Sequence, residues 1–416
     1  MSEAYGISRF VMDSGERCCF VIDRSSGLPL YHPNLFLTTQ LRNRSVASAT
    51  VEAAASHLVV LMRFLDRTRI DLESRFSSRR FLKEFELDAL RDFVQRKIRK
   101  SAANSNQHSS SAHGASEASY ISSGTQYTRL TTIADYLNWY ANHLLDNADL
   151  DAVEQIETMC RQVRARRPRE KKRNIEKRNS SLSDEQIDAL FEVMRPGSEL
   201  NPFDRYVQRR NRLMILLLFH LGVRRGELLN LRIRDIDFAR NQIRVVRRAD
   251  EKDDPRTDEP NAKTQGRLLP LGDALAAELH GYITGERRTV RKASRNDFLF
   301  VTHKNGPTVG KPISKAAYQK VIVVARAVSP LLVGMSGHKL RHTWNRRFSE
   351  KMDSMDVRLG ETRQEQIRSY LMGWKEGSGT GATYNRRFVE QKGYEAALEM
   401  QEASGTRVPE RLRNVH

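Results

Sequence analysis

The chain has 416 residues and a formal net charge of +19, with 70 Lys and Arg against 51 Asp and Glu. At roughly 100 to 200 residues per domain, this length predicts two or three domains. The longest apolar run, Leu213–Phe219, is far shorter than the ~20 residues of a membrane span, and the N-terminus lacks a signal peptide's apolar stretch. Three Cys without a CxxC pair argue against a disulfide scaffold or a structural zinc site. The charge makes a polyanion the first partner to expect.

The positive charge is unevenly distributed along the chain. Residues 1–160 carry 18 basic and 19 acidic side chains, residues 161–180 carry 10 and 2, and residues 181–416 carry 42 and 30. The dense middle stretch cannot fold compactly on itself, and Pro168 interrupts helix continuity there. We interpret residues 161–182 as an exposed basic linker, which is either a solvated tether or a strap along a phosphate backbone.

The N-terminal residues contain two short β-type runs. Arg9–Met12 and Cys19–Asp23 lie on either side of an Asp-Ser-Gly sequence, a pattern typical of a hairpin. We therefore predict an N-terminal extension over residues 1–45 that contains this hairpin. No residue in it indicates a chemical role.

Helical patterns follow the extension. Apolar spacing predicts one helix from Ser48 or Thr50 and a second near Asp88–Lys100. The second helix has a basic face formed by Arg91, Arg96, Lys97, Arg99 and Lys100. The Ser-rich residues 101–125 predict a flexible loop, after which the pattern returns to an amphipathic helix. Residues 46–160 therefore predict a small helical domain interrupted by one long loop.

The next domain opens with a recognisable helix start. Ser183 and Gln186 form a capping box, which predicts a helix that begins there. A strongly apolar helix, about Arg209–Leu221, is expected to end at Gly222, and a short helix is expected over Gly226–Leu231.

Short β-rich pieces come next. They are Ile243–Val246, Arg267–Leu271 and Phe298–Val301. From Ser314 to about Met400 the pattern is mostly helical. Residues 183–400 thus predict a mainly α domain with a small antiparallel β-sheet, and residues 401–416 form a C-terminal tail.

Four pieces of this domain contain groups suited to phosphate chemistry. In chain order they are Gly222-Val-Arg224-Arg-Gly-Glu227, Ala262-Lys263-Thr-Gln-Gly-Arg267, His338-Lys-Leu-Arg341-His342, and Gly373-Trp374 with Tyr384 ten residues after the Trp. Each piece alone is common by chance. Four of them in this order, ending in a Tyr behind a glycine-rich loop, form a specific set.

These pieces resemble the tyrosine recombinases of the phage-integrase family, the group that includes Cre, the Xer proteins and lambda integrase. The resemblance covers about residues 183–400. It extends more weakly to residues 46–160, which are similar to the family's helical core-binding domain, a DNA-binding domain. It implies a two-domain clamp around DNA.

The reaction of that family explains why these residue types are needed. A DNA phosphodiester is an anion and resists attack by another oxyanion. Two Arg forks can hold both non-bridging oxygens and neutralise the charge of the transition state, and Arg224 and Arg341 match those positions. A Tyr hydroxyl, with a pKa of about 10, needs a nearby base or a strong positive field to act as a nucleophile.

The resemblance assigns the remaining roles. Tyr384 is the nucleophile that forms a 3′-phosphotyrosyl link and releases a 5′-hydroxyl. Lys263 matches the general acid for the leaving oxygen, and His338 matches the residue that assists proton movement. Trp374 stands where most of the family has a second His, and its indole N–H can donate to a phosphate but cannot titrate.

Glu227 matches an acidic position that supports the basic cluster, and His342 is a second supporting residue. The interval from Trp374 to Tyr384 is one residue longer than the family's usual nine, and its glycine loop can absorb the excess.

The resemblance also implies partners and conditions. The covalent link stores the energy of the broken phosphodiester, so the reaction needs no metal, nucleotide or other cofactor. Expected partners are double-stranded DNA and further copies of the chain in a tetrameric synapse, with accessory recombination proteins left open and no membrane. Beyond the basic helix face, the expected DNA contacts are Arg164, Arg166, Arg167, Lys171, Lys172 and Arg173. We expect a cytoplasmic bacterial protein that is associated with the nucleoid when active.

Several functions stay open at this point. Integration, excision or transposition of a mobile element is the first, and a chromosome or plasmid resolvase of the same chemistry is an alternative. A catalytically inactive DNA-binding accessory protein on the same fold is another. A metal-dependent transposase or nuclease would need a divalent ion. His338 and His342 have the spacing of zinc ligands, but Lys339 replaces the Glu of such motifs and no third ligand is evident.

Overall fold

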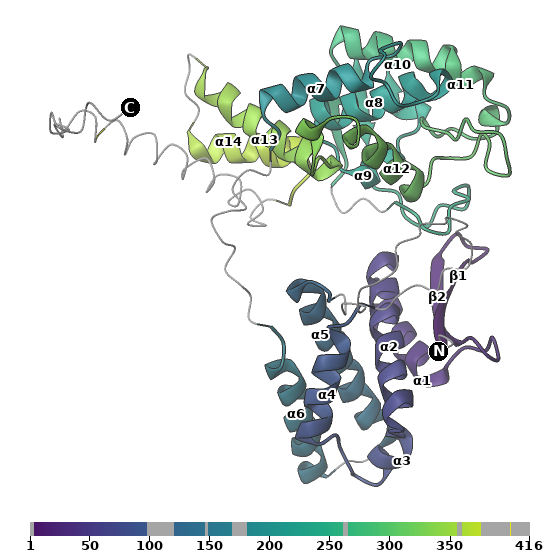
Figure 1. Ribbon diagram of the computed structural model, residues 1–416, viewed down its shortest axis with the longest axis vertical. Coiled ribbons are helices and arrows are strands. Elements are labelled where there is room, and N and C mark those ends of the chain that lie inside the picture. The colour runs from purple at the N-terminus through teal and green to yellow at the C-terminus, as the bar shows by residue number, and fades with distance from the viewer. Residues whose placement is uncertain are drawn as a thin grey trace, which may run out of the picture. The chain divides into compact units, whose positions relative to one another are not determined.

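The computed structural model describes residues 4–97, 120–145, 149–168, 181–260, 265–355, 360–375 and 400. The chain divides into two compact units, Met1–Arg173 and Asn174–His416 (Figure 1). Both are mostly helical, and each described part contains one small antiparallel sheet. The predicted fold class, mainly α with a small antiparallel sheet in the second unit, is therefore confirmed.

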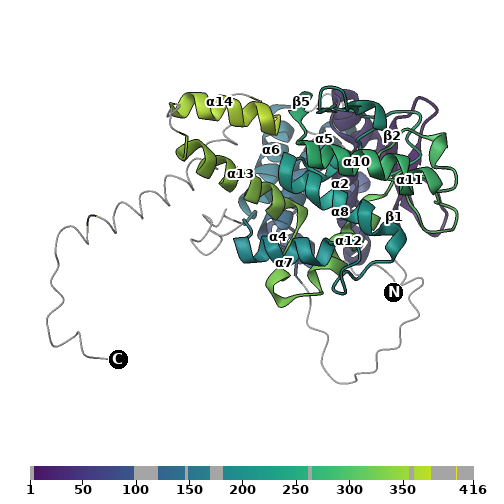
Figure 2. The same ribbon diagram turned by 90° about the horizontal axis from the view of Figure 1, so that it is seen from above.

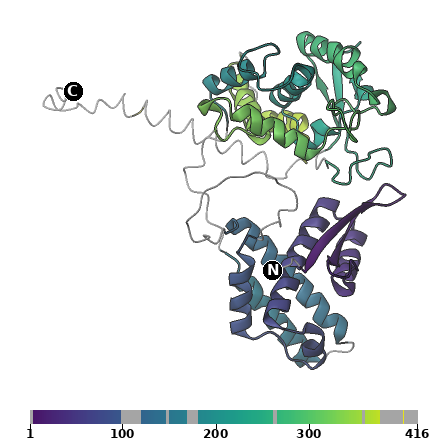
Figure 3. The same cartoon turned by 45° about the vertical axis from the view of Figure 1, so that its right-hand side comes forward.

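The first unit begins with a hairpin. Strand β1 (Tyr5–Val11) pairs with β2 (Arg17–Asp23) in antiparallel register, with Tyr5 opposite Asp23 and Val11 opposite Arg17. The strands are longer than the two apolar runs of the sequence because backbone pairing continues through polar residues. The hairpin lies along the second helix of the unit (Figure 3), where Arg63 donates a hydrogen bond to the Tyr5 carbonyl at 2.8 Å.

Helices build the rest of this unit. They are α1 (Tyr31–Phe36), which continues as a π-helical turn, α2 (Ser48–Thr68), α3 (Leu72–Ser77), α4 (Glu84–Val94), α5 (Ser123–Leu144) and α6 (Leu150–Ala165). Their apolar faces meet in one core that includes Leu58, Leu90 and Leu137. Among the described helices, α2 alone is long and apolar enough to cross a membrane by length and composition, and a buried core helix passes the same test.

Helix α4 ends earlier than the sequence indicates. It was expected to run to Lys100 but ends at Val94, so Arg96 and Lys97 follow the helix instead of lying on its face. Arg129 of α5 donates to the Val94 carbonyl at 2.6 Å, and the Ile121 amide donates to the Gln95 carbonyl at 2.9 Å. These bonds satisfy carbonyl groups that a longer helix would have used. The predicted continuous basic face is therefore wrong for these two residues.

The second unit is arranged around one buried helix. Its helices are α7 (Asp184–Met194), α8 (Arg205–Leu221), α9 (Arg225–Leu229), α10 (Asp273–Thr284), α11 (Glu286–Thr289), α12 (Lys315–Arg326), α13 (Gly337–Asp353) and α14 (Glu361–Met372). The apolar run Leu213–Phe219 is buried throughout, as the sequence predicts. Helix α8 packs against α7, α10 and α13 (Figure 2). The predicted capping box of Ser183 and Gln186 is present at the start of α7.

The small sheet has a composition different from the one expected. Strands β3 (Ile236–Asp237), β4 (Gln242–Val245) and β5 (Arg267–Pro270) pair in that order, all antiparallel. The predicted strand Phe298–Val301 makes only isolated bridges, to Arg232 at one end and to Pro312 at the other. All four of its side chains are buried, so the run lacks the alternating faces of a sheet strand in this position.

Candidate active site

Arg341 connects three of the four sequence motifs. Its side chain is 3% exposed, and its two terminal nitrogens donate to the carbonyl of Gly222 and to the carbonyl of Met372, the latter at 3.0 Å. Gly222 ends α8 and Met372 is the last residue of α14. Carbonyl groups at helix C-termini carry partial negative charge, which stabilises a cation there. The guanidinium also lies 5.6 Å from the centre of the Trp374 ring.

Gly222 is required by the way these helices meet. Its φ of 60° lies in the left-handed region that ends helices. A Cβ atom there would lie 2.6 Å from the terminal methyl of Met372 and 2.9 Å from the Trp344 ring. The glycine thus lets α14 and α13 approach the chain two residues before Arg224.

A buried ion pair supports Arg224. Glu227 accepts a hydrogen bond from the Arg224 backbone amide at 2.9 Å, and its carboxylate lies 3.8 Å from the Arg224 guanidinium. The same carboxylate accepts two hydrogen bonds from Arg267, at 2.9 and 3.2 Å, and both partners are almost fully buried. Glu227 therefore fixes the backbone from which Arg224 extends.

Arg267 is a residue whose importance the sequence did not reveal. It begins β5, and its Nε donates to the Leu371 carbonyl of α14 at 2.7 Å. It thus joins the strand after Lys263 to the helix before Trp374. One signal was available in the alternation of β5, where Arg267 shares the inward face with Leu269. An Arg on such a face predicts a buried carboxylate partner.

His338 and His342 lie on the first turns of α13. Their rings meet edge to face, with centroids 4.3 Å apart. His338 is exposed, and Ser336 caps the helix by accepting the Lys339 amide at 3.2 Å. The positive end of the α13 dipole therefore lies beside an exposed imidazole, a setting that favours a bound anion.

Trp374 is positioned by the end of α14. Gly373 adopts φ 65°, and the Trp374 amide donates to the Ser369 carbonyl at 2.9 Å, so the chain turns sharply after the helix. The indole is nearly buried beside Arg341. On the other side, the Gln265 amide donates to the Gly373 carbonyl at 3.1 Å, which brings the chain after Lys263 to the same turn.

Two of the proposed catalytic residues, Lys263 and Tyr384, lie outside the described residues, as do Arg99, Lys100, Lys171, Lys172 and Arg173. The other proposed catalytic residues lie at the ends of α8, α13 and α14. Arg341 joins the first, third and fourth motifs directly, and the pair of Glu227 and Arg267 adds the second.

The expected DNA contacts in the first unit have partners within the protein. Arg91 pairs with Asp92 at 2.9 Å, Arg164 with Asp135 at 2.7 Å and Arg166 with Asp88 at 2.6 Å. Arg167 lies over the Tyr127 ring and donates to Thr131 at 3.2 Å. Helix α6 includes residues 161–165, so the basic stretch begins on a helix. The carboxylates would compete with a phosphate for these guanidinium groups.

Comparison with known proteins places the second unit in context. Residues 180–390 match the sequence model of the phage integrase family, an interval that contains every motif from Arg224 to Tyr384. The tyrosine recombinase XerD of Staphylococcus aureus is 27% identical over 163 residues, which cover 39% of this chain and 46% of that protein. XerD of Oceanobacillus iheyensis is 24% identical over 179 residues, 43% of this chain and 50% of that protein. The chain thus spans about half the length of these curated relatives.

Solved structures were also compared with the chain. The integrase of transposon Tn1549 in complex with transposon right end DNA has a TM-score of 0.49 and 14% identity, covering 86% of this chain and 98% of that chain. A lambda integrase dimer bound to a core site has a TM-score of 0.41 and 14% identity, covering 90% and 93%.

Proposed function

The chain belongs to the phage integrase family, and on that premise we propose that it is a site-specific tyrosine recombinase that cuts and rejoins DNA through a 3′-phosphotyrosyl intermediate. The observation that carries the proposal is the setting of Arg341. This buried residue of the third motif is hydrogen-bonded to the first motif at Gly222 and to the end of α14 at Met372, beside Trp374. A reaction that needs several cationic groups around one phosphate requires the motifs to meet in this way.

Each described residue has a role in this proposal. Arg224 and Arg341 hold the non-bridging oxygens of the scissile phosphate and neutralise the charge that builds on them. Trp374 packs beside Arg341 and orients it, and its N–H donates to a phosphate oxygen. His338, exposed at the N-terminus of α13, takes part in proton movement. Glu227 holds the Arg224 backbone in place.

The remaining steps are assigned by family membership. The oxygen of Tyr384 attacks phosphorus, and Lys263 donates a proton to the 5′-oxygen that leaves. The covalent link keeps the free energy of the broken bond, and a 5′-hydroxyl of another duplex then reverses the step. We propose that four copies of the chain perform this exchange on two DNA duplexes.

We propose a mobile element as the setting. The hairpin formed by β1 and β2 precedes the helices of the first unit and is unlike the Xer proteins, whose helical domain starts near the N-terminus. Integration, excision or transposition is therefore preferred over chromosome resolution. Residues 46–160 act as the DNA-binding domain, and the basic residues 161–182 act as a strap along the duplex.

A covalent adduct tests the chemistry. The DNA is a duplex that the protein selects from a random-sequence library, nicked so that the released strand diffuses away. The unaltered protein should form an adduct that survives denaturing electrophoresis, also in excess EDTA, because no divalent ion takes part. Tyr384→Phe should abolish the adduct.

Tyr370→Phe is the matched control, because Tyr370 is an exposed tyrosine of α14 whose hydroxyl contacts only a backbone carbonyl at 3.5 Å. An adduct from Tyr384→Phe would overturn the assignment of the nucleophile. Selective DNA binding by the unaltered protein without any adduct would favour an inactive accessory protein.

A further inference from the structure

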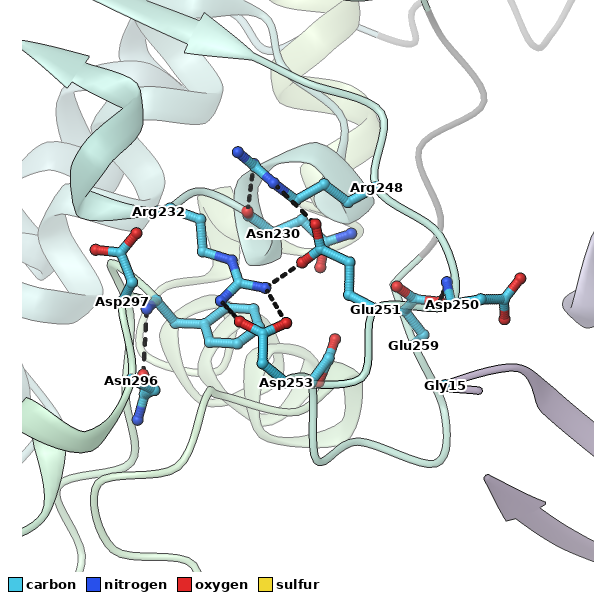
Figure 4. Close-up of polar contacts among 12 residues, drawn as sticks. Gly15, Asn230, Arg232, Arg248, Asp250, Glu251, Asp253, Glu259, Asn296 and Asp297 are labelled. Carbon is cyan, nitrogen blue, oxygen red and sulfur yellow. Dashed lines mark hydrogen bonds and ion pairs between the residues drawn. The ribbon is translucent and has the colours of Figure 1, made fainter. Parts of the chain in front are cut away.

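The segment between β4 and β5, residues 246–266, is long and charged and contains Lys263. Connections longer than about 12–15 residues without secondary structure are uncommon in compact domains and are usually functional. Its first half is fixed by Arg232, which lies 3.6 Å from the centre of the Phe298 ring (Figure 4). The Arg232 guanidinium pairs with Glu251 and with Asp253, the latter at 2.9 Å. Arg248 pairs with Asp235 at 2.6 Å.

The second half is fixed by Arg256. Its Nε and one terminal nitrogen donate to Asp254, the latter at 2.7 Å, and that nitrogen also donates to the Asn230 side chain at 2.7 Å. The other terminal nitrogen donates to the carbonyls of Leu229 at 3.0 Å and Ile313 at 3.2 Å. The guanidinium is buried and all three of its nitrogens are bonded, so it holds the segment in one position.

Asn230 continues this connection to the residues just before Lys263. It follows α9, the helix that begins after Arg224, and its side-chain amide donates to the Pro260 carbonyl at 2.5 Å. On the far side, the Gln265 amide donates to the Gly373 carbonyl at 3.1 Å. The chain is therefore tied to the site on both sides of Lys263, at Pro260 near the end of α9 and at Gln265 beside Trp374.

These ties matter because lysine is a poor positioning group by itself. Its ammonium ends a flexible four-carbon stem, and ordering that stem costs conformational entropy. A general acid must lie within hydrogen-bond reach of its target, and a displacement of about 1 Å can cost about 100-fold in rate. Fixing the backbone on both sides limits the positions that the ammonium group can reach.

We propose that Arg256 and Asn230 are positioning residues for Lys263, and that they place its ammonium group against the leaving 5′-oxygen. The inference rests on the proposed function. In the step concerned, the Tyr384 oxygen bonds to phosphorus and its proton passes to His338. The bond from phosphorus to the 5′-oxygen breaks with its electron pair on that oxygen, which takes a proton from the Lys263 ammonium.

A sulfur atom in place of the 5′-bridging oxygen separates positioning from general damage. A thiol has a pKa of about 8.5, far below that of an alcohol, so a thiolate leaves without a proton donor. The selected duplex is mapped for its cleavage position and synthesised with oxygen or with sulfur there. The measured quantity is the rate of adduct formation.

We expect Arg256→Gln and Asn230→Ala to slow cleavage of the oxygen substrate by about 100-fold and to cleave the sulfur substrate at close to the unaltered rate. Lys263→Ala should show the same pattern. Arg224→Ala should slow both substrates, because it acts on the phosphate itself.

Arg287→Gln is the matched control. Arg287 is also buried and donates to the carbonyls of Phe298 and Asn296, at 3.0 and 2.9 Å, but neither bond reaches the residues beside Lys263. It should lose stability without any selective loss on oxygen. Equal slowing of both substrates by Arg256→Gln and Asn230→Ala, or no slowing by either, would overturn the inference while Lys263→Ala still behaves as a general-acid variant. If the unaltered protein forms no adduct with either substrate, the proposed function fails and the inference fails with it.

Discussion

The two units use arginine in different ways. In the first, Arg164 and Asp135 pair with 38% and 50% of their side chains exposed, and Arg79 and Asp149 pair with both side chains about half exposed. In the second, Arg267 and Glu227 pair with 1% and 0% exposed. Exposed pairs contribute little to stability because water and salt screen them. A buried pair is costly to break, since loss of one partner leaves an uncompensated charge. The second unit therefore uses its pairs to fix a site, whereas those of the first stay accessible to solvent.

The largest effect is expected from the buried pair. Glu227→Gln should lower the free energy of unfolding by about 3–5 kcal/mol, because Arg267 keeps its charge in a dry environment. The double variant Glu227→Gln with Arg267→Met should lose less than the sum of the single variants. Chemical denaturation of the three proteins measures this coupling. Additive losses would show that the two side chains act independently.

Gly222 offers a smaller test of the same site. Gly222→Ala should lower the free energy of unfolding by about 1–3 kcal/mol through backbone strain and overpacking against Met372 and Trp344. Gly197→Ala is the control, because Gly197 also has a positive φ, 80°, but open space where its Cβ would lie. The difference between the two losses isolates the packing contribution. Equal losses would mean that the close approach of α13 and α14 has no energetic weight.

Local sequence signals predicted much of this fold. The capping box at Ser183, the helix end at Gly222 and the apolar stripes of α2, α5 and α8 all depend on neighbours a few residues away. The motif residues of the second unit were identified in the same way, by type and spacing.

The features that were missed depend on distant residues. Helix α4 ends at Val94 because Arg129 and Ile121 bond its last carbonyls. Arg267 acquires its role from Glu227, 40 residues earlier in the chain. Neither partner can be identified from local spacing, since many carboxylates and arginines could have met.

Each unit also contains a buried histidine that should weaken it in acid. Burial lowers the pKa of His57 in the first unit and of His303 in the second to about 4, with help from Arg129 and Arg210 respectively. Below an unfolded pKa of 6.5 the unfolded chain binds protons that the folded chain does not. The stability present above that pH should therefore be lost as the pH falls toward 4.

His57→Gln and His303→Gln should each flatten the fall of the unfolding free energy between pH 6.5 and 4. Denaturation series across that range measure the slope for each variant. An unchanged slope in either variant would show that the other residues of its unit control the acid response.

The smallest effect on stability is expected from the exposed pair of Arg164 and Asp135, and it separates the two uses of arginine most directly. Asp135→Asn should change the free energy of unfolding by less than about 1 kcal/mol, and less at high salt. The same change frees Arg164 for a phosphate, so affinity for random-sequence duplex should rise and become more salt-dependent, by about one unit of slope. Arg164→Gln should have the opposite effect on affinity with an equally small effect on stability. If both variants leave the salt slope unchanged, Arg164 does not contact DNA, and the pair belongs to the solvated surface of α5 and α6.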